Sequence, residues 1–464
     1  MTGTRAIIIG GGISGLSLAF FLKQRGIRVT LLEKTDRTGG VIRTSHPQGF
    51  LVEHGPNSTL QKPGDATDAL GRLMDGLGLH PQIAAKSATR RYVQKSGRLQ
   101  PLPLSPLAFL QTPLFSATAK LRVLLEPFRS RATQEESVSQ FVRRRLGPEF
   151  LDWAIDPFIS GVYAGDPERL SVRAAIPKIY ALEHQYGSLI RGAIALRKQG
   201  RINGMPKGRL ISFAGGMEDL VKALRNHCSQ PASDQVEIMT GVSVETIEPL
   251  HAGGWCVTGK GGVQKSGDWL ILAIAADEAA RLVRPLSTGS ADTLASIRHA
   301  PVVSMALGFA RKQVNHPLDG FGFLIPAKEK SELLGCLFSS SIFPGRAGED
   351  HVILTTFLGG TRHPTVVAYR EDELIAIAME RLEHTLGVPS PPPFVHITRY
   401  QQAIAQYELG HLEKLEHLQK SLASQPGLHL CGNFIGGVSV ADRVRYSEQL
   451  ANHLAHSQTF GGVH

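Results

Sequence analysis

The stretch RAIIIGGGISGLSLAFFLKQRGIRVTLLEK, residues 5–34, decides the fold of this chain. An apolar strand runs into glycines, and a helix and a second strand follow before the acidic residue Glu33. Gly10 gives a tight turn, Gly12 lets the backbone approach a pyrophosphate, and Gly15 allows close helix packing. The helix N-terminus supplies free amides, and a carboxylate at position 33 can accept hydrogen bonds from an adenosine ribose. The order of these parts predicts a Rossmann-like dinucleotide-binding unit in an α/β protein.

The next residues, TDRTGGVIRT at 35–44, favour FAD over NAD, although both dinucleotides use the preceding unit. This stretch resembles the extended FAD fingerprint of flavin oxidases, in which a second glycine pair approaches the pyrophosphate from the other side. Gly39, Gly40 and Arg43 fit the glycine pair and its neighbouring positive charge, whereas an ordinary hairpin turn is the alternative for the pair alone. The other cofactor contacts expected in residues 5–44 are Gly11, Ile13, Ser14, Lys34 and Val41.

The composition is typical of a multidomain protein without a spanning helix or a metal site. Of the 464 residues 42% are apolar, and no uninterrupted apolar run reaches the roughly 18 residues of a membrane span. The four cysteines are scattered and lack the paired spacing of zinc or iron–sulfur ligands, which favours free thiols in a reducing compartment. The first strand begins almost at the N-terminus, so a cytoplasmic or already processed protein is expected.

The chain is basic, with a formal net charge of +10 and a pI near 9.5. It contains no pattern of a nucleic-acid-binding module, so anionic small molecules and anionic lipid head groups are the better candidate partners. The positive charge is concentrated at Arg90–Arg91, at Arg129 with Arg131, and at residues 143–145. For any one of these clusters a solvated helix face is the simpler interpretation.

Three separated pieces, residues 1–78, 205–290 and 396–464, are expected to build the FAD-binding domain. In the second piece Val244 lies in a predicted strand whose backbone could meet the adenine, or it is an ordinary strand residue. The third piece, GLHLCGNFIGGVSVADRV, predicts a strand, a glycine-rich turn and a helix whose amides could face the flavin. Its candidate cofactor residues are Gly432, Gly436, Gly437, Val438, Ser439 and Val440.

Two further regions lie between these pieces. Residues 79–103 and 291–395 predict an α+β substrate-binding domain, with a sheet that buries one face and leaves the other available to a ligand. Residues 104–204 predict a helical, membrane-associating insertion, because apolar and basic residues are interleaved there. An internal helical core explains the same apolar residues. The apolar members are Leu107, Phe109, Leu110, Leu114 and Phe115, and the basic members are Lys120, Arg122, Arg129 and Arg131.

The segment PFISGVYAGDPERLSVRAAIPKIYALEHQYGSLI resembles the signature region of the protoporphyrinogen oxidase family of haem synthesis. LVEHGPNS, GFGFLIPAKEKSELLGCLFSSSIFPGRAG, ITRYQQAIAQYELGH and LCGNFIGGVSVADRV match the same family in the same order. The resemblance therefore covers nearly the whole chain. It implies an FAD-dependent oxidase that removes six electrons from a porphyrinogen in three passes, using oxygen and releasing hydrogen peroxide each time. We expect the flavin to supply the difficult chemistry, and no side chain is identified as a catalytic base.

The resemblance also implies substrate and flavin contacts at particular residues. Arg91 matches the arginine that pairs with a substrate propionate, although Arg90 beside it leaves the register open. Gly161 and Ala164 are expected to line the macrocycle, or to form a helix C-cap, and Leu307 and Phe338 to sandwich pyrrole rings, or to be simple core. Tyr400 is expected beside the flavin, where the family commonly has a tryptophan, and Ala405 is a second departure from the family pattern. The segment expected to pass near the flavin consists of Gly55, Pro56, Asn57 and Ser58.

Several alternatives remain at this stage. Family relatives oxidise coproporphyrinogen, which carries four propionates instead of two, and the positive charge is compatible with either substrate. A flavin amine oxidase, a carotenoid desaturase and a non-catalytic prenyl-protein escort share the architecture, and a porphyrin carrier with structural FAD is the alternative from another class. Attachment to the inner face of the membrane is expected, whereas a homodimer and transfer of the product to a ferrochelatase stay open.

Overall fold

The structure is a computed structural model that describes residues 4–65, 68–198, 208–230 and 235–460. Its central element is a five-stranded parallel sheet with the strand order β10-β2-β1-β14-β20. The strands are β1 (Arg5–Ile9), β2 (Arg28–Leu32), β10 (Val236–Met239), β14 (Trp269–Leu272) and β20 (Leu428–Leu430). The first, second and third sequence pieces therefore meet in one sheet, and all four strand pairings are parallel.

Both faces of this sheet are covered, which explains why its strands read as continuous apolar runs. Ala6 and Ile8 of β1 belong to a core with four helices, while Ile7 and Ile9 belong to a second core on the opposite face. The four helices are α1 (Ile13–Lys23), α2 (Ala69–Leu77), α11 (Glu218–Cys228) and α17 (Val440–Phe460). The opposite face carries β11 (Val244–Pro249), β12 (Trp255–Gly259), β13 (Val263–Gly267), α12 (Ala276–Val283) and α13 (Thr288–Ala295), with α16 (His411–Leu422) packed beyond them.

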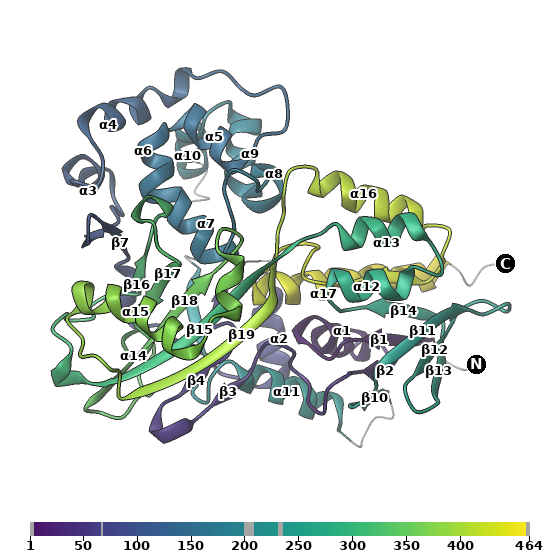
Figure 1. The fold of residues 1–464 in the computed structure, drawn as a ribbon. Helices are drawn as coiled ribbons and strands as arrows, with labels where there is room; N and C mark the ends of the chain where they lie inside the picture. The colour runs from purple at the N-terminus through teal and green to yellow at the C-terminus, as the bar shows by residue number, and fades with distance from the viewer. Residues whose placement is uncertain (1–3, 66–67, 199–207, 231–234, 461–464) are drawn as a thin grey trace.

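A seven-stranded sheet forms the second part of the molecule, on the left in Figure 1. Its order is β19-β15-β18-β17-β16-β7-β8. The bounds are β7 (Tyr92–Lys95), β8 (Arg98–Pro101), β15 (His299–Ala310), β16 (Gly322–Leu324), β17 (Leu333–Leu337), β18 (His351–Gly359) and β19 (Phe394–Ala405). The expected boundary at residue 396 falls within β19, which pairs with β15 on both sides of an irregularity between Ala300 and Val302.

The expectation of one buried and one available face is wrong for the centre of this sheet, because Val302 to Phe309 of β15 are all buried. Helix α15 (Glu371–Leu386) covers one face. On the other face the rings of Phe50 and Phe394 stack at 4.7 Å, and a Cβ on Gly308 would lie 2.6 Å from Phe50. The neighbouring strands keep half-buried side chains on that second face, among them Leu324 of β16, Phe357 of β18 and Tyr400 of β19.

Short strands join the two parts. β3 (Thr44–Ser45) pairs with β4 (Val52–Glu53), and β9 (Arg209–Ser212) pairs with both β5 (Thr59–Gln61) and β6 (Gln82–Ile83). Arg346, from the loop before β18, is buried and ion-paired to Glu53 of β4 at 2.6 Å. The same guanidinium donates to the Ser212 hydroxyl of β9, so one side chain connects three segments that are far apart in the sequence.

The helical insertion stands above the sheets in Figure 1. Its helices are α3 (Pro106–Gln111), α4 (Ala117–Leu124), α5 (Val138–Arg145), α6 (Pro148–Phe150), α7 (Asp156–Tyr163), α8 (Val172–Ala175), α9 (Pro177–Tyr186) and α10 (Leu189–Lys198). The 3₁₀ turn η3 (Glu126–Phe128) follows α4, and the π-helical turn η4 (Leu151–Ile155) leads into α7. No helix in the described part of the chain is both long and apolar enough to cross a bilayer.

In the arginine run at 143–145 only Arg143 is exposed, where it pairs with Glu168 at 2.7 Å, so the interpretation as a solvated basic face is wrong for Arg144 and Arg145. Arg145 is 0% exposed and pairs with Glu126 at 3.0 Å and also with Glu183. Arg144 pairs with Glu183 at 2.8 Å and with Glu136. Because an unpaired charge is costly in a protein interior, these arginines neutralise buried carboxylates of the insertion and are not available to lipid or substrate.

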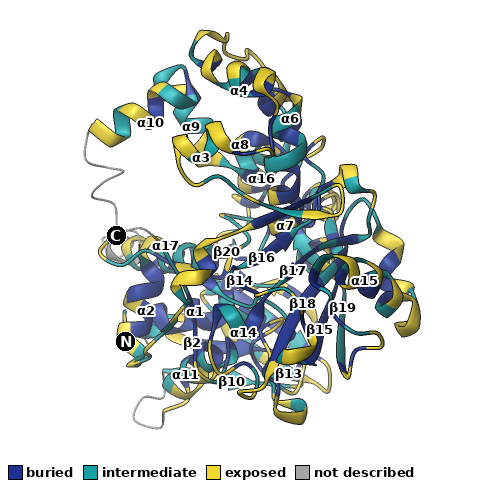
Figure 2. Ribbon diagram, turned by 90° about the vertical axis from the view of Figure 1, so that its left-hand side faces the viewer, coloured by how far each residue is buried: buried dark blue, intermediate teal, exposed yellow. Residues whose placement is uncertain are grey.

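The apolar residues of the insertion divide between the two interpretations offered for them. Leu114 and Phe115 are buried, and Phe109 packs against them together with Phe150. The other members of the set point outward, Leu107 with 64% and Leu110 with 54% of the residue exposed. Figure 2 shows exposed positions along α3, α4 and α10.

Candidate functional site

The first glycine turn lies at the carboxyl end of β1, where backbone crowding excludes any other residue. A Cβ on Gly10, whose φ is +107°, would lie 2.5 Å from the Ala273 carbonyl oxygen, and one on Gly15 would lie 2.0 Å from the Gly10 carbonyl oxygen. Gly12 is the N-cap of α1, and no side chain caps that helix. The amides of Ile13 and Ser14 therefore stand in the uncapped first turn, where a phosphate can accept their hydrogen bonds.

Glu33 stands at the carboxyl end of β2 beside this turn and is buried. Its carboxylate accepts hydrogen bonds from the Gly11 amide at 2.7 Å and from the Thr35 amide at 2.9 Å. These bonds fix the carboxylate next to the turn, where a ribose would present its hydroxyls. Val242 donates to the Glu33 carbonyl at 2.9 Å, so the segment that leads into Val244 runs beside the same acid.

The second glycine pair packs directly against the first turn. The Gly39 amide donates to the Gly11 carbonyl at 2.7 Å, and a Cβ on Gly40 would lie 3.2 Å from the Gly12 Cα. Arg37, which sequence reasoning missed, donates to the Gly40 carbonyl at 2.7 Å and so braces the pair. An arginine two residues before a glycine pair could have been suspected from the sequence TDRTGG.

Three other expected cofactor residues of this region lie at its edge. Lys34 is exposed and forms a 3.3 Å ion pair with Glu278. Val41 is exposed, and its carbonyl accepts from the Tyr400 hydroxyl at 3.4 Å. Arg43 is exposed, and its carbonyl accepts from the His54 amide at 2.9 Å. The structure therefore brings Val41 and Tyr400 together and directs Lys34 to a carboxylate of the protein.

The segment 55–58 lies against the same loop. A Cβ on Gly55 would lie 2.2 Å from the Val41 carbonyl oxygen, so glycine is required there. Pro56 and Ser58 are half-buried, and the Asn57 side chain lies 3.4 Å from the Gly55 carbonyl in a local hydrogen bond.

His54, which precedes this segment, is buried between the loop and β19. Its Nε2 lies 2.9 Å from the Ser45 hydroxyl and its Nδ1 lies 3.1 Å from the Thr398 hydroxyl. Burial, with the nearby His396 and Arg43, lowers the pKa of His54 to about 4. The ring is therefore neutral near pH 7 and acts as a hydrogen-bond bridge between two segments.

The C-terminal glycine turn lies at the carboxyl ends of β14 and β20. A Cβ on Gly432 would lie 2.4 Å from the Ile274 carbonyl oxygen, and Gly436 and Gly437 have φ values of +75° and +111°. Buried Arg443 of α17 donates to the Gly432 and Ile435 carbonyls and holds the turn. The last candidates of this piece, Val438, Ser439 and Val440, lead into α17, where the Ser439 hydroxyl accepts from the Asp442 amide at 3.1 Å.

Two residues after β19 join this turn to α7. The Tyr407 hydroxyl donates to the Asn433 carbonyl and accepts from the Gly437 amide, both at 2.9 Å. Gln406 donates from its side chain to the Tyr163 carbonyl at the end of α7 at 2.8 Å. The C-terminal glycine turn and the end of α7 are thereby connected to the same segment of chain.

The expected macrocycle contacts are partly wrong. Leu307 and Phe338 are both 0% exposed and belong to the core against α15, so they face away from α7. Side chains alternate along a strand, and the opposite face carries the residues that meet α7. A Cβ on Gly161 would lie 2.6 Å from Leu324 Cδ2.

The residues that sequence reasoning missed are therefore Leu324, Leu334 and Phe357. All three are half-buried, and Leu334 and Phe357 pack with buried Ala164. Ala164 has a φ of +46° and is the left-handed C-cap of α7, so the cap interpretation and the packing interpretation both apply. Leu324, Leu334 and Phe357 lie on one face of the sheet and Leu307 on the other, and the sequence does not show which face a strand residue joins unless the strand register is known.

The structure distinguishes the two neighbouring arginines. Arg90 is ion-paired to Asp319, whereas Arg91 is exposed and lies 5.3 Å from the ring centroid of Phe321. Within the described ranges no carboxylate lies at ion-pair distance from Arg91. Arg91 is therefore the free guanidinium of the pair, as a carboxylate-binding role requires.

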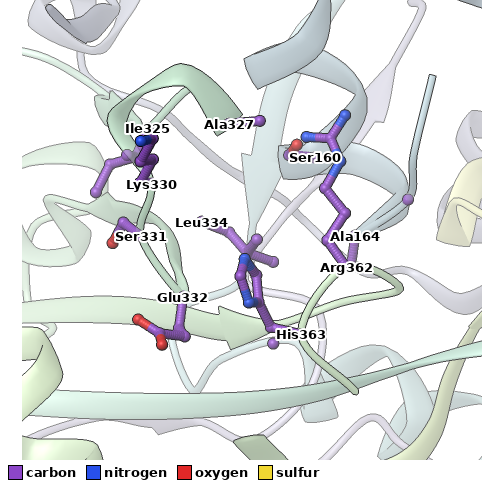
Figure 3. Close-up of a pocket in the computed structure, with 12 residues that line it drawn as sticks. Ser160, Ala164, Ile325, Ala327, Lys330, Ser331, Glu332, Leu334, Arg362 and His363 are labelled. Atoms are coloured by element: carbon purple, nitrogen blue, oxygen red, sulfur yellow. The ribbon is translucent and has the colours of Figure 1, made fainter. Parts of the chain in front are cut away.

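A pocket of about 360 Å³ lies behind this face. Figure 3 shows Ser160 of α7, the C-cap residue Ala164 and Arg362 on one side of the pocket, and the loop with Lys330 and Glu332 on the other. Arg362 is engaged by Asp156 at 2.5 Å and Asp166 at 3.0 Å. Ala164 and Leu334 line this pocket and also belong to the apolar cluster that contains Phe357.

Comparison with known proteins agrees with this geometry. The family model described as flavin containing amine oxidoreductase matches residues 13–443. Protoporphyrinogen oxidase 2 of Arabidopsis thaliana is 31% identical over 96% of this chain and 92% of its own. Coproporphyrinogen III oxidase of Bacillus subtilis is 27% identical over 94% of each chain.

Solved structures show the fold. A crystal structure of an Exiguobacterium protein superposes with a TM-score of 0.82 at 23% identity, covering 98% of this chain and all of that one. A putrescine oxidase superposes with a TM-score of 0.69 at 17% identity, covering 98% and 99%. The predicted fold class, a Rossmann-like FAD-binding domain of the flavin amine oxidase type, is confirmed.

Proposed function

The chain belongs to the flavin-containing amine oxidoreductases and, within them, to the protoporphyrinogen oxidase family, and from this we propose that it oxidises protoporphyrinogen IX to protoporphyrin IX. It is an FAD-dependent oxidoreductase with a porphyrinogen oxidase role in haem biosynthesis. The observation that carries the substrate proposal is the match to porphyrinogen oxidases over at least 94% of the chain.

The overall reaction removes six hydrogens, as six electrons and six protons, from the porphyrinogen. Three molecules of oxygen accept them in three steps, and three molecules of hydrogen peroxide leave. The product is a fully conjugated, planar macrocycle, whereas the substrate is a flexible ring of pyrroles joined by saturated bridges. A site for both needs an apolar face with little steric bulk and a polar anchor for the propionates.

The described residues fit FAD. The uncapped first turn of α1 presents amides to a pyrophosphate, and Glu33 is fixed where it can accept from a ribose. A Cβ on Gly10 or Gly15 would collide with backbone oxygens, so the turn keeps the open cradle that a phosphate needs. When bound, FAD supplies the acceptor for hydride that leaves a methylene bridge.

The residues of the chain itself orient the substrate. Leu324, Leu334 and Phe357 offer apolar contacts to pyrrole rings, and Gly161 leaves the room that a side chain would fill. Arg91 anchors a propionate, since a guanidinium binds a carboxylate in a planar fork. Placement of the bridge carbon against the flavin is the catalytic contribution of this site, and none of these five residues transfers a proton.

The test is to incubate the purified holoprotein under air with protoporphyrinogen and, separately, with coproporphyrinogen. Porphyrin fluorescence and hydrogen peroxide are measured together. We expect three peroxides per porphyrin and faster turnover of protoporphyrinogen. Turnover at the spontaneous rate, despite bound FAD, would reject the oxidase and favour a porphyrin carrier.

Coproporphyrinogen III is the second candidate substrate. It is supported by the likeness to the Bacillus subtilis enzyme over 94% of both chains and by the net charge of +10. A tetracarboxylate would profit more from basic side chains than a dicarboxylate. Selective turnover of coproporphyrinogen in the same assay establishes this alternative.

Peripheral attachment to a membrane is proposed for the insertion. Residues at the edge of the insertion expose large apolar side chains, with Leu104 at 70% and Phe128 at 80% exposure. Further members of this surface are Leu107, Leu110, Leu121, Leu124 and Leu125. Such an exposed set suits insertion into the interfacial region of a bilayer.

The test is flotation with vesicles that contain anionic lipid. We expect the wild type to float and Leu107→Ser/Phe128→Ser to remain at the bottom, while Leu60→Ser, an exposed leucine outside the insertion, floats. Equal flotation of all three proteins would reject this surface.

A further inference from the structure

Arg362, in the loop after β18, joins two carboxylates that flank α7. Its guanidinium lies 2.5 Å from Asp156, the first residue of α7, and 3.0 Å from Asp166, which follows the helix. None of the three side chains is more than 25% exposed. Charge-assisted hydrogen bonds are the strong ones, and partial burial strengthens them further. Arg362, Asp156 and Asp166, which we call the α7 clamp, therefore fix both the start of the helix and the turn after its end.

Backbone contacts of the same loop hold the carboxyl end of α7. The Thr361 amide donates to the Ala164 carbonyl at 2.8 Å. Gly360 has a φ of +77°, and a Cβ there would lie 2.5 Å from the same carbonyl oxygen. Ala164 itself has a φ of +46°, which is unfavourable for a residue with a Cβ and needs support from its surroundings. The loop that carries Arg362 thus contacts both ends of the helix.

The clamp also connects α7 to the strands of the apolar face. The Asp156 carboxylate accepts from the Ala327 amide at 2.8 Å, and Ala327 lies three residues after Leu324 of β16. β18, which carries Phe357, leads directly into the loop of Arg362. The ion pairs therefore join the helix to the ends of two strands whose side chains face it.

Close packing holds α7 on one side only. Ile159 and Tyr163 are buried in a core on that side, whereas Ser160 and Ala164 line the pocket of about 360 Å³. Figure 3 shows Arg362 on the same side of this pocket as Ser160 and Ala164. A helix that borders a cavity can shift toward it without the collisions that a close-packed interior imposes. The position of α7 therefore depends on the clamp as well as on packing.

We propose that Arg362 is a positioning residue for porphyrinogen oxidation, because its ion pairs set the distance between α7 and the apolar face of the sheet. This inference rests on the proposed function and deepens it, since Gly161 of α7 and Leu324 of the sheet belong to the proposed substrate face. Arg362 acts through the helix and not by contact with the substrate, because two carboxylates already engage its guanidinium. A displacement of about 1 Å from a productive geometry can cost about a hundredfold in rate.

The test compares Arg362→Met, Arg362→Lys and Asp166→Asn in the holoprotein. Lysine keeps the charge of Arg362 but lacks the planar fork that serves two carboxylates. Val29→Ala is the control for lost stability, because Val29 is buried in the core on the other face of the five-stranded sheet. The Kd of protoporphyrin is measured by fluorescence quenching, and KM and kcat of protoporphyrinogen are measured under air. Bound flavin and the midpoint of urea unfolding are determined for each protein.

We expect kcat/KM of Arg362→Met to fall about a hundredfold, shared between a rise in KM and a fall in kcat. The Kd of protoporphyrin rises about tenfold, and bound flavin stays at the wild-type level. Arg362→Lys recovers about tenfold of the lost kcat/KM, and Asp166→Asn, which leaves the Asp156 pair intact, loses about tenfold. Val29→Ala unfolds at less urea but keeps the kcat/KM of the wild type.

Four results would overturn the proposal. The first is wild-type kcat/KM in Arg362→Met or, if that variant does not fold, in Asp166→Asn. The second is an Arg362→Lys protein no better than Arg362→Met. The third is an equal loss of kcat/KM in Val29→Ala, since lost stability would then explain the effect. The fourth is loss of flavin from the clamp variants, which would place their effect on the cofactor.

The outcomes separate this inference from the proposed function. If the wild type binds no porphyrin and oxidises neither porphyrinogen, the proposed function fails. If the wild type oxidises protoporphyrinogen and Arg362→Met does so equally well, the function stands and the positioning role of Arg362 is rejected.

Discussion

Replacing Arg346 by methionine removes one half of a buried ion pair and leaves the other half without its counterion. The Arg346 and Glu53 side chains are 3% and 1% exposed, and their charged atoms lie 2.6 Å apart. Breaking such a pair from one side costs about 3–5 kcal/mol, because an uncompensated charge stays buried. Glu53 keeps hydrogen bonds from the Thr44 hydroxyl at 2.7 Å and the Met217 amide at 2.8 Å, which favours the lower end of this range.

The stability lost in Arg346→Met depends on pH. Burial raises the pKa of Glu53 above its usual value, and the Arg346 charge is the largest opposing influence. Without Arg346 the pKa rises further. A carboxyl with a raised folded pKa contributes its stability below the unfolded pKa and loses it as pH rises through the folded value. Arg346→Met is therefore least harmful in acid, and its deficit grows toward neutral pH.

The assay is urea unfolding, followed by tryptophan fluorescence at two pH values. The four proteins of the cycle are the wild type, Arg346→Met, Glu53→Gln and the double variant, and Arg370→Met is the control because Arg370 and Asp372 are exposed. We expect the double variant to be more stable than Arg346→Met alone, since no charge is then left buried. A double variant that loses the sum of both single losses, or an Arg346→Met protein as stable as the control, would refute the reasoning.

Three further predictions concern substrate binding and the pH dependence of stability. Gly161→Val retains FAD but raises KM for the porphyrinogen at least about tenfold, because the new side chain meets Leu324. Ala174→Val on α8 is the control. An unchanged KM in Gly161→Val contradicts the proposal that Gly161 and Leu324 line the substrate site. Arg91→Met raises KM for the dicarboxylate about tenfold and leaves that of the dimethyl ester unchanged. Arg90→Met, which breaks the Asp319 pair and a 3.5 Å hydrogen bond to the Tyr92 hydroxyl, changes neither KM; a reversed pattern would place the anchor at Arg90. Burial lowers the pKa values of His54, His411 and His429 to about 4, so each folded-state pKa lies below the unfolded one and stability is lost as pH falls from about 6.5 toward 4. His54→Asn flattens this loss in urea unfolding, and an unchanged slope contradicts the burial of a neutral ring.

Local patterns of the sequence were sufficient for the dinucleotide unit. Strand, glycine turn, helix and terminal acid follow one another within residues 5–34. Each conformational requirement of the unit is met by a residue itself or by its near neighbours in the sequence. Gly15 is an example, because its missing Cβ makes room for the carbonyl of Gly10 only five residues away. Such short-range constraints are visible in one dimension.

The substrate face depends on strand register, which a single sequence does not reveal. On β15 the odd-numbered residues Met305 and Leu307 face α15, while Ala306 faces Phe50. A shift of the strand register by one residue moves every side chain to the opposite face of the sheet. The apolar character of a strand residue therefore does not show which face it joins. The choice of Leu307 and Phe338 therefore failed, and Leu324, Leu334 and Phe357 became evident only from their packing against α7.

The arginine run of the insertion shows a related limit. Three successive arginines predict a basic surface if their partners are unknown, but Glu126 and Glu183 lie at sequence distances of 19 and 38 from Arg145. Only the folded chain brings these carboxylates to the guanidinium. Net charge thus describes the whole surface of the protein, while the electrostatics of one helix depend on pairs that are distant in sequence.

The residues after β19 explain how the separated pieces act as one site. Tyr407 holds both ends of the segment from Asn433 to Gly437 through a single hydroxyl, and Gln406 holds the end of α7. A shift of α7 would therefore move the glycine turn through this connection, since each bond is buried or half-buried. Tyr407→Phe keeps the ring but breaks both contacts to the turn. The glycine motifs identify what is bound. Gln406 and Tyr407, which lie within the family-matching segment ITRYQQAIAQYELGH, connect the C-terminal glycine turn to the end of α7.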